Sequence, residues 1–230
     1  MPSSPALPAP AAAPAATAAP ASRRKSQEGG APLPELREAC ITAAREAIAR
    51  DGIEGLSLRE VARRLGVSHQ APYKHYPSRD HLLAEVVRRC FEQFAQHLDA
   101  RAHFDDPRQD LQSLGRQYLD YARQFPVEYR LMFATPWPAA AEQSELLHTS
   151  TKAFDMLRQV LQRIHGAGEA QRERVDLDAL FAWSAMHGLV GVMTGNCVDR
   201  LGLQQKLLAQ LVQHVLDGVA RGLSAPQPRA

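Results

Sequence analysis

Residues 57–76 read SLREVARRLGVSHQAPYKHY. Ser57 and Glu60 have the spacing of a helix-capping box, and Gly66 is the kind of residue that commonly ends a helix. The pattern predicts two short helices, 58–65 and 69–75, with a tight turn between them and Ser68 as the second cap. Two interpretations fit this spacing: a helix-turn-helix that reads DNA, or two ordinary surface helices of a bundle.

The side chains around the second helix suit contact with DNA. Its first three residues offer base-edge hydrogen-bonding groups or a small apolar surface for a thymine methyl, and they are His69, Gln70 and Ala71. A second set offers hydroxyl or cationic groups that can hold phosphates: Ser57, Ser68, Tyr73, Lys74 and Arg79. Capped helix starts at 57, 68 and 78 would add backbone amides for phosphates. We therefore predict that the first set contacts bases and the second contacts the DNA backbone.

Outward from this stretch, apolar residues recur at helical spacing, and prolines and glycines separate the segments. The expected helices are 34–52, 58–65, 69–75, 79–100, 107–125, 126–134, 141–165, 172–197 and 203–222. No alternating strand pattern appears between turn signals. The predicted fold is all-α, with an N-terminal three-helix domain at 34–83 and a helical bundle at 84–224.

The two ends of the chain have a different composition. Residues 1–33 are almost all Pro, Ala, Ser and Gly, so they have little to bury and are expected to be disordered, as is 225–230. The basic triplet at 23–25 follows the Ala/Pro run instead of preceding an apolar one, which argues against a secretory signal. The triplet is either a charged linker or an arm that reaches along DNA.

Charge and composition narrow the function classes. The 230 residues carry a net charge of +2; 13 Lys/Arg and 9 Asp/Glu lie in 1–89, against 14 and 16 in 90–230, so a polyanion would bind near the N-terminus. Cys40, Cys90 and Cys197 form neither a CxxC pair nor an even set. The nine histidines lack metal-site spacing, and no catalytic or nucleotide-binding motif occurs. We expect no metal, no cofactor and no enzymatic activity.

Residues 179–198 have no formal charge over twenty positions, the length of a membrane span. Four polar residues, three glycines and the absence of basic flanks favour a helix buried between protein neighbours. We predict a core helix and a cytoplasmic protein without a membrane partner.

The last two expected helices suggest an interface between two copies of the chain. Segment 203–222 has a wide apolar stripe, and 172–197 has small side chains on one face that permit close helix approach. Two such helices from each chain would form a four-helix interface. The residues assigned to it are Ala185, Gly188, Val192, Gly195, Leu208, Leu211, Val212 and Val215. The alternative is a monomer with a broad core stripe.

Residues 36–83 resemble the DNA-binding domain of the tetracycline-repressor (TetR/AcrR) family of bacterial regulators. The resemblance is carried by Gly52, SLREVA at 57–62, GVS at 66–68, YKHY at 73–76 and SRDHLL at 78–83. It implies that the two residue sets named above face bases and backbone. Pro72 departs from the family pattern, which more often has Leu there, and Tyr76 replaces the commoner Phe. Because Pro72 lies in the first turn of its helix, it would remove at most about one hydrogen bond but could tilt the helix.

The C-terminal half is similar to the Trp-His-Gly (WHG) type of C-terminal domain in that family, through YRLMF at 129–133 and WSAMHG at 183–188. The resemblance implies a pocket for a small, largely apolar molecule. The candidate lining residues are Tyr118, Tyr121, Phe125, Tyr129, Phe133, Trp137, Trp183 and His187. Each of them also fits an ordinary core position. His187 needs a polar partner, either a ligand or a backbone carbonyl.

Together these features predict a homodimeric, ligand-responsive DNA-binding repressor. Its partners would be a pseudo-palindromic double-stranded operator, a second copy of itself and a small-molecule effector. Two alternatives remain open: a constitutive DNA-binding protein whose C-terminal half only dimerises, and a helical carrier or enzyme.

Overall fold

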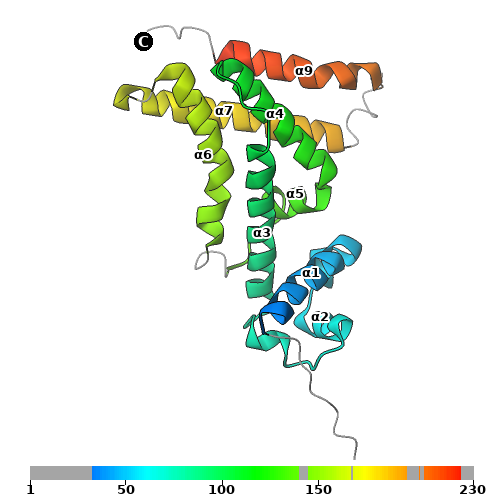
Figure 1. The fold of residues 1–230 in the computed structure, drawn as a ribbon. Coiled ribbons are helices and arrows are strands. Elements are labelled where there is room, and N and C mark those ends of the chain that lie inside the picture. Colours follow the sequence, from blue (N-terminus) through cyan, green and yellow to red (C-terminus); the bar gives the residue numbers. More distant parts are fainter. Residues whose placement is uncertain (1–32, 140–144, 167, 196–201, 203–204, 224–230) are drawn as a thin grey trace, which may run out of the picture. The chain divides into compact units, whose positions relative to one another are not determined.

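The computed structural model describes residues 33–139, 145–166, 168–195, 202 and 205–223. Within these ranges every regular element is a helix and no strand occurs (Figure 1), so the predicted all-α class is confirmed. The tails at 1–32 and 225–230 lie outside the described residues, as does Cys197. The described helices all belong to one unit of the chain, residues 32–230.

The N-terminal helices end and begin as the local sequence predicts. Helix α1 (Leu33–Asp51) ends before Gly52, whose φ is 76°, and α2 (Leu58–Leu65) ends before Gly66, whose φ is 65°. The Ser57 Oγ accepts the backbone N–H of Glu60 at 3.1 Å, and Ser78 Oγ accepts that of His81 at 3.4 Å. Both predicted caps are confirmed. A short 3-10 helix, η1 (Ile53–Gly55), connects α1 to α2.

Helix α3 (Arg79–Asp99) runs alongside α1 and then continues among the C-terminal helices (Figure 1). Two polar contacts join α3 to α1: Arg89 pairs with Glu38 at 2.7 Å, and Arg45 donates to Gln93 at 3.1 Å. On α3, the side chains of Phe91, Phe94 and Leu98 are buried. One continuous helix therefore belongs to both halves of the described chain.

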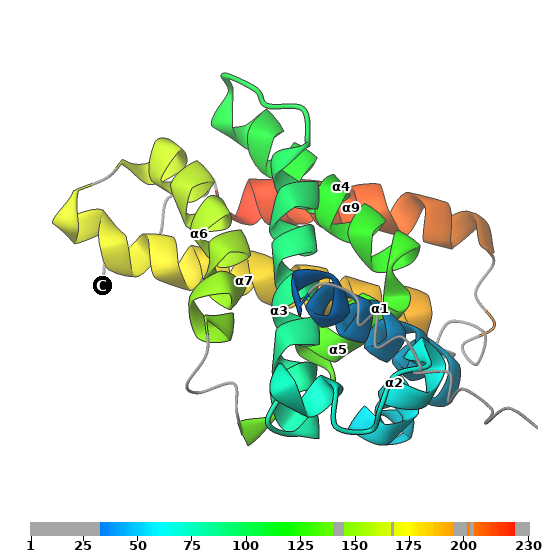
Figure 2. The ribbon, with the colours of Figure 1, turned by 60° about the horizontal axis from the view of Figure 1, so that its bottom comes forward.

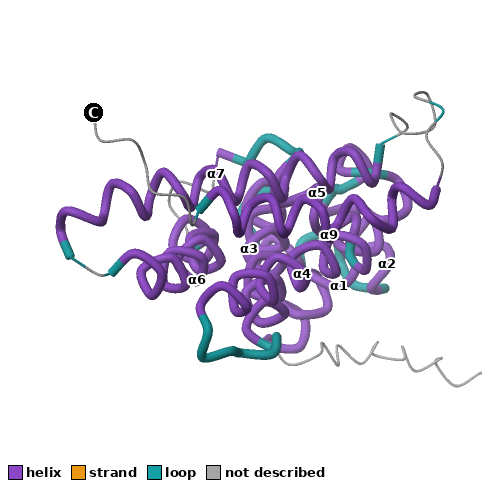
Figure 3. Tube along the Cα trace, turned by 90° about the horizontal axis from the view of Figure 1, so that it is seen from above, coloured by secondary structure: helices purple, strands orange, loops and turns teal. Residues whose placement is uncertain are grey.

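The described part of the C-terminal half contains five more helices: α4 (Pro107–Gln124), α5 (Pro126–Phe133), α6 (Leu146–His165), α7 (Glu169–Thr194) and α9 (Gln205–Gly222). Proline opens α4 and α5, where its missing N–H costs no intrahelical bond. Helix α6 packs on α3, α4 and α7, and α9 lies against α4 and α7 (Figures 2 and 3). The predicted helices agree within a few residues, apart from 69–75, which is treated below.

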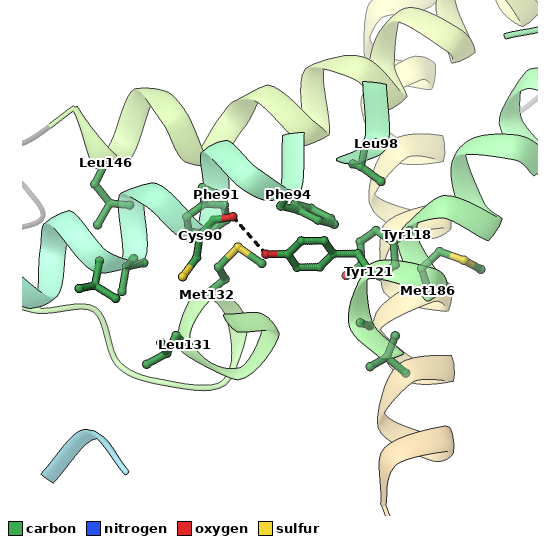
Figure 4. Close-up of a cluster of buried hydrophobic side chains, with 14 of the residues drawn as sticks. Cys90, Phe91, Phe94, Leu98, Tyr118, Tyr121, Leu131, Met132, Leu146 and Met186 are labelled. Carbon is green, nitrogen blue, oxygen red and sulfur yellow. Dashed lines mark hydrogen bonds between the residues drawn. The ribbon is translucent and has the colours of Figure 1, made fainter. Parts of the chain in front are cut away.

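The core around α3 is continuous with that of α4 and α5 (Figure 4). Tyr121 is fully buried there, and its hydroxyl donates to the carbonyl of Cys90 at 3.3 Å. Cys90 is itself buried, and burial raises the pKa of its thiol to about 12. A thiol with so high a pKa is inert at neutral pH, as the interior position of this cysteine leads one to expect.

The connection between α3 and α4 is held by a buried ionic cluster. Asp110, about 1% exposed, accepts Arg163 Nη1 at 2.6 Å and lies 3.3 Å from Arg101 Nη2. Arg101 is also buried and donates to the carbonyl of Leu98 at 3.2 Å. Arg163 reaches further, to the carbonyls of Phe104 and Asp105. One carboxylate thus ties α6 to the loop that precedes α4.

Helix α7 has a buried and an exposed side. Residues 171–194 are long and apolar enough to cross a membrane by length and composition, yet only about 28% of the most apolar window is buried. One side packs on α4, α6 and α9. The other exposes Leu180, Phe181 and Val192. The prediction that 179–198 is a core helix therefore holds for the inner face and is wrong for the outer one.

Removing the charge of Asp110 should destabilise the fold. In Asp110→Ala, Arg101 would keep its buried guanidinium without a counter-charge, and breaking a buried pair in this way costs about 3–5 kcal/mol. Urea unfolding of the purified protein measures the loss. The control is Asp105→Ala, an exposed neighbour whose replacement should stay within about 0.5 kcal/mol of wild type. Equal stability of the two variants would show that the cluster contributes nothing.

Candidate functional site

The segment after Gly66 is not the α-helix that the sequence predicts for 69–75. Residues 69–71 form turns, and 72–74 form a 3-10 helix, η2 (Pro72–Lys74). Successive bonds join Ala71 N to Ser68 O at 3.0 Å, Lys74 N to Ala71 O at 3.3 Å and His75 N to Pro72 O at 3.0 Å. The α-helical bond to Ser68 O would come from residue 72, and Pro72 has no N–H to give. The backbone tightens instead, and Ser68 caps no α-helix.

This tighter winding changes which side chains share a face. In a 3-10 helix, residues three apart lie above one another. Pro72 is buried, and His75 below it is partly buried, so that face turns inward. Gln70 is exposed, and Tyr73 is 43% exposed on the same line. Gln70 and Tyr73 therefore form the outward edge of the segment.

The side chains predicted to hold phosphates differ in exposure and in the hydrogen bonds that they form within the protein. Ser68, Tyr73 and Lys74 are exposed, and no hydrogen bond or ion pair is recorded for their side chains among the described residues. Ser57 is exposed but caps α2. Arg79 is largely engaged, because its Nε and Nη2 donate to the carbonyls of Leu56 and Ile53 at 3.0 and 2.6 Å. This side chain therefore braces the loop before α2, and its contact with a phosphate stays a prediction.

A cavity of about 650 Å³ lies among α3, α4, α5, α6 and α7. Its volume is typical of a small-molecule site. The described lining is mostly apolar and contains no Lys, Arg, Asp or Glu. Aromatic rings supply much of the wall: Phe91, Phe94, Tyr118, Phe133, Trp137, Phe154, Trp183 and His187.

One polar cluster interrupts this apolar wall. The hydroxyls of Tyr118 and Tyr129 lie 3.0 Å apart, and each lies 2.6 Å from Nδ1 of His187. The His187 ring also lies against Trp183 and Phe133, with a centroid distance of 4.7 Å to each. The partner that His187 finds inside the protein is thus a pair of tyrosine hydroxyls, where the sequence suggested a backbone carbonyl or a ligand.

Burial keeps this cluster uncharged. It lowers the pKa of His187 to about 4, because the partly dry site disfavours the imidazolium. Burial also raises the pKa of Tyr118 and of Tyr129 above the ordinary value of a phenol. At neutral pH the cavity therefore offers hydrogen-bonding groups without a charge.

Sequence-family models match both halves of the chain. Residues 41–86 match bacterial regulatory proteins of the tetR family, and residues 111–227 match the tetracyclin repressor-like C-terminal domain. The second match alone covers half of the chain. The chain belongs to the TetR family. It is therefore a DNA-binding transcription regulator, and the exposed segment around Gln70 lies within the matched N-terminal region.

Solved structures share the fold of this TetR-family chain. The regulatory protein SCO4313 is 23% identical with a TM-score of 0.67, and the match covers 81% of this chain and 96% of that one. A protein from Rhodococcus sp. RHA1 is 25% identical with a TM-score of 0.66, covering 88% and 100%. A tetR-family protein from Shewanella sp. PV-4 is 17% identical with a TM-score of 0.61, covering 81% and 97%. No curated protein matches the chain in sequence.

The structure brings together most of the residues predicted to line a pocket. Tyr118, Phe133, Trp137, Trp183 and His187 line the cavity, and Tyr129 joins its polar cluster. Tyr121 and Phe125 do not line it: Tyr121 is fully buried in the core, and its ring lies 4.9 Å from that of Phe125. The sequence analysis missed Phe91, Phe94 and Phe154, since their helical spacing is that of any core residue.

The residues predicted for the interface between chains divide into two groups. Gly188 and Val192 are exposed on α7, and Gly195 is exposed directly after it. Ala185, Leu211, Val212 and Val215 are partly buried against the chain's own core. The side chain of Leu208 lies outside the described residues. Three large apolar side chains that α7 exposes are not among the predicted interface residues: Leu177, Phe181 and Leu180, the last of which also lines the cavity.

The lowered pKa of His187 predicts a pH dependence of stability. Between pH 6.5 and 4 the unfolded chain binds a proton at His187 that the folded chain does not, so stability falls as pH falls through this window. Over that range wild type should lose about 1–2 kcal/mol more than His187→Gln, a value reduced for partial solvent access. Urea unfolding at several pH values measures the difference. Replacing the exposed His148 by Gln is the control; identical profiles for wild type and His187→Gln would refute the assignment.

Proposed function

We propose that the protein is a homodimeric, ligand-responsive repressor of the bacterial cytoplasm. It binds a pseudo-palindromic operator through two copies of the segment at 57–79 and releases it when a small, largely apolar molecule enters the cavity. The division into a DNA-binding domain at 34–83 and a ligand-binding and dimerisation domain of the WHG type at 84–224 belongs to this proposal. The observation that carries it is the double contact made by α5.

Helix α5 contacts both the cavity and α1. Met132 and Phe133 line the cavity, and Tyr129 belongs to its polar cluster. One residue before Tyr129, Glu128 accepts Arg45 Nη2 of α1 at 2.8 Å. Since α5 has only eight residues, a shift that accommodates a ligand would move Glu128 with the aromatic residues. This link supports a protein in which a ligand in the cavity controls DNA binding, as opposed to one that binds DNA constitutively.

The exposed segment around η2 supports the assignment of the DNA contacts. We propose that His69, Gln70 and Ala71 contact bases, with Tyr73 beside Gln70 on the outward edge. Ser57, Ser68, Tyr73 and Lys74 would contact phosphates, together with Arg79 Nη1, which lies 3.6 Å from Asp80 Oδ1 in the absence of DNA. In a dimer, two such segments would enter successive major grooves about 34–36 Å apart.

The outer face of α7 supports the dimer. Leu177 and Phe181 are 59% and 50% exposed, which is unusual for large apolar side chains of a monomer. Further along the same helix, Gly188 and Gly191 are exposed, and a Cβ at either would meet nothing within 4 Å in this chain. A second copy of α7 could approach closely there. We propose that α7 and α9 of two chains form a four-helix interface.

The experiment that tests this function is a DNA titration. The DNA is the fragment immediately upstream of the protein's own gene, with random DNA of the same length as the control, at several salt concentrations. A repressor of this kind should bind the upstream fragment at least about a thousandfold more tightly than random DNA, with two chains per site. Equal and steeply salt-dependent binding to both DNAs would contradict a specific regulator of this fragment.

Two substitutions in the exposed segment should have different effects. Gln70→Ala should weaken binding to the operator by about 1–3 kcal/mol for each of the two chains and leave random DNA almost unaffected, because it removes one base contact per chain. Lys74→Ala should weaken both and reduce the slope of log affinity against log salt by about one for each chain, because it removes one phosphate contact per chain. The same titration measures both. Equal effects on the two DNAs in both variants would refute the division into base and backbone contacts.

A charge on the outer face of α7 should separate the dimer. Phe181→Arg should weaken self-association by about 30-fold or more, the effect of losing a central aromatic contact. Sedimentation equilibrium gives the dissociation constant. The control is Leu147→Arg, which places the same charge at an equally exposed apolar position on α6. If the control dissociates the protein and Phe181→Arg does not, the interface lies elsewhere.

A further inference from the structure

The cavity's polar groups limit the chemistry of its occupant. Three of them are already used within the protein: Ser150 Oγ donates to the carbonyl of Leu147 at 2.8 Å, Thr151 Oγ1 to that of His148 at 3.0 Å, and Trp137 Nε1 to that of Met132 at 3.0 Å. What remains in the lining is the cluster of Tyr118, Tyr129 and His187, together with the indole N–H of Trp183, which contacts Tyr118. A ligand must therefore find its polar contact there.

The polar hydrogens of this cluster can be counted to find which hydrogen-bonding groups are not used within the protein. Both hydroxyls approach Nδ1 of His187, and they also contact each other. In the neutral ring Nδ1 is either a donor or an acceptor. As an acceptor, it uses one hydroxyl hydrogen and leaves an N–H on Nε2. As a donor, it leaves one hydroxyl hydrogen unused and a lone pair on Nε2. In both cases the cluster retains an unused hydrogen, and Nε2 has no hydrogen-bond partner among the described residues.

The same surroundings disfavour a charged ligand. The described lining contains no cation that could pair with a carboxylate and no anion that could pair with an ammonium group. Moving an unpaired ion from water into so apolar a site costs several kcal/mol. The walls instead present rings, several of them in edge-to-face contact: Phe91 lies 5.6 Å from Trp137, and Phe154 lies 5.5 Å from Trp183. A flat aromatic molecule can join such packing.

We propose that the cavity binds an uncharged aromatic molecule with one hydrogen-bonding oxygen, which contacts the His187–Tyr129–Tyr118 cluster. The inference rests on the proposed function only in treating the occupant as the effector. Binding itself is measured without DNA, so its failure is distinguishable from failure of the operator titration.

The chain offers a direct probe of this cavity. It contains two tryptophans, Trp137 and Trp183, and both line the cavity. In ¹⁵N-labelled full-length protein the two indole N–H signals therefore report on occupancy. The ligands are three molecules with one frame: 4-phenylphenol, which is neutral at pH 7.5, biphenyl-4-carboxylate, which is an anion, and 4-phenylbenzylammonium, which is a cation.

The expected result is that 4-phenylphenol shifts both indole signals and binds at least about tenfold more tightly than either ion. His187→Phe keeps an aromatic ring and removes the hydrogen bond. It should weaken the binding of 4-phenylphenol about tenfold or more, and it should reduce the ratio of this affinity to the affinities of the two charged ligands. His148→Phe, at an exposed position of α6 outside the lining, should change nothing. If His187→Phe does not fold, Tyr129→Phe tests the same cluster.

Two results would overturn the proposal. One is equal or tighter binding of the carboxylate or the ammonium compound, which would show that a charge is accepted. The other is the absence of any indole shift with all three ligands at 1 mM.

Discussion

One continuous helix constrains the rest of this structure. Helix α3 runs beside α1, where Arg89 pairs with Glu38 at 2.7 Å, and its next turns place Phe91, Phe94 and Leu98 in the cavity wall. A helix of 21 residues is stiff, so the part of α3 that packs on α1 and the part that lines the cavity move together. Helix α5 adds a second connection through Glu128 and Arg45. A change of shape at the cavity would therefore reach α1 through two elements, as the proposed ligand control of DNA binding requires.

The cavity combines two physical demands that are difficult to meet together. An apolar wall gives affinity for an apolar molecule, whereas polar groups in such a wall need partners. The chain resolves this with three side chains from three helices, α4, α5 and α7, which satisfy one another around Nδ1 of His187. Burial keeps them neutral, because it lowers the pKa of His187 and raises that of Tyr118. The cluster would thus give the proposed ligand site specificity without the cost of a buried charge.

Local chemistry explains why much of the fold could be predicted from sequence. Ser57, Gly66 and Ser78 act on the backbone within three or four residues, so the ends of α2 and the start of α3 follow from the chain alone. The sequence predicts an α-helix over 69–75 because Pro72 fits a first turn, but the missing N–H of Pro72 gives a 3-10 winding instead. The cavity walls of α3 and α6 escaped prediction for another reason. Helical spacing shows that Phe91 and Phe154 point inward, and it cannot tell whether they meet a neighbouring side chain or an empty volume.

The central claim is that the cavity and the DNA-binding segment are coupled. Its most direct test is the operator affinity of the protein with the cavity empty and with the cavity saturated by 4-phenylphenol, saturation being read from the indole signals of Trp137 and Trp183. The account predicts that saturation weakens operator binding about 5- to 150-fold, the range of typical allosteric coupling, while binding to random DNA changes much less. An unchanged operator affinity with both indole signals fully shifted would contradict it.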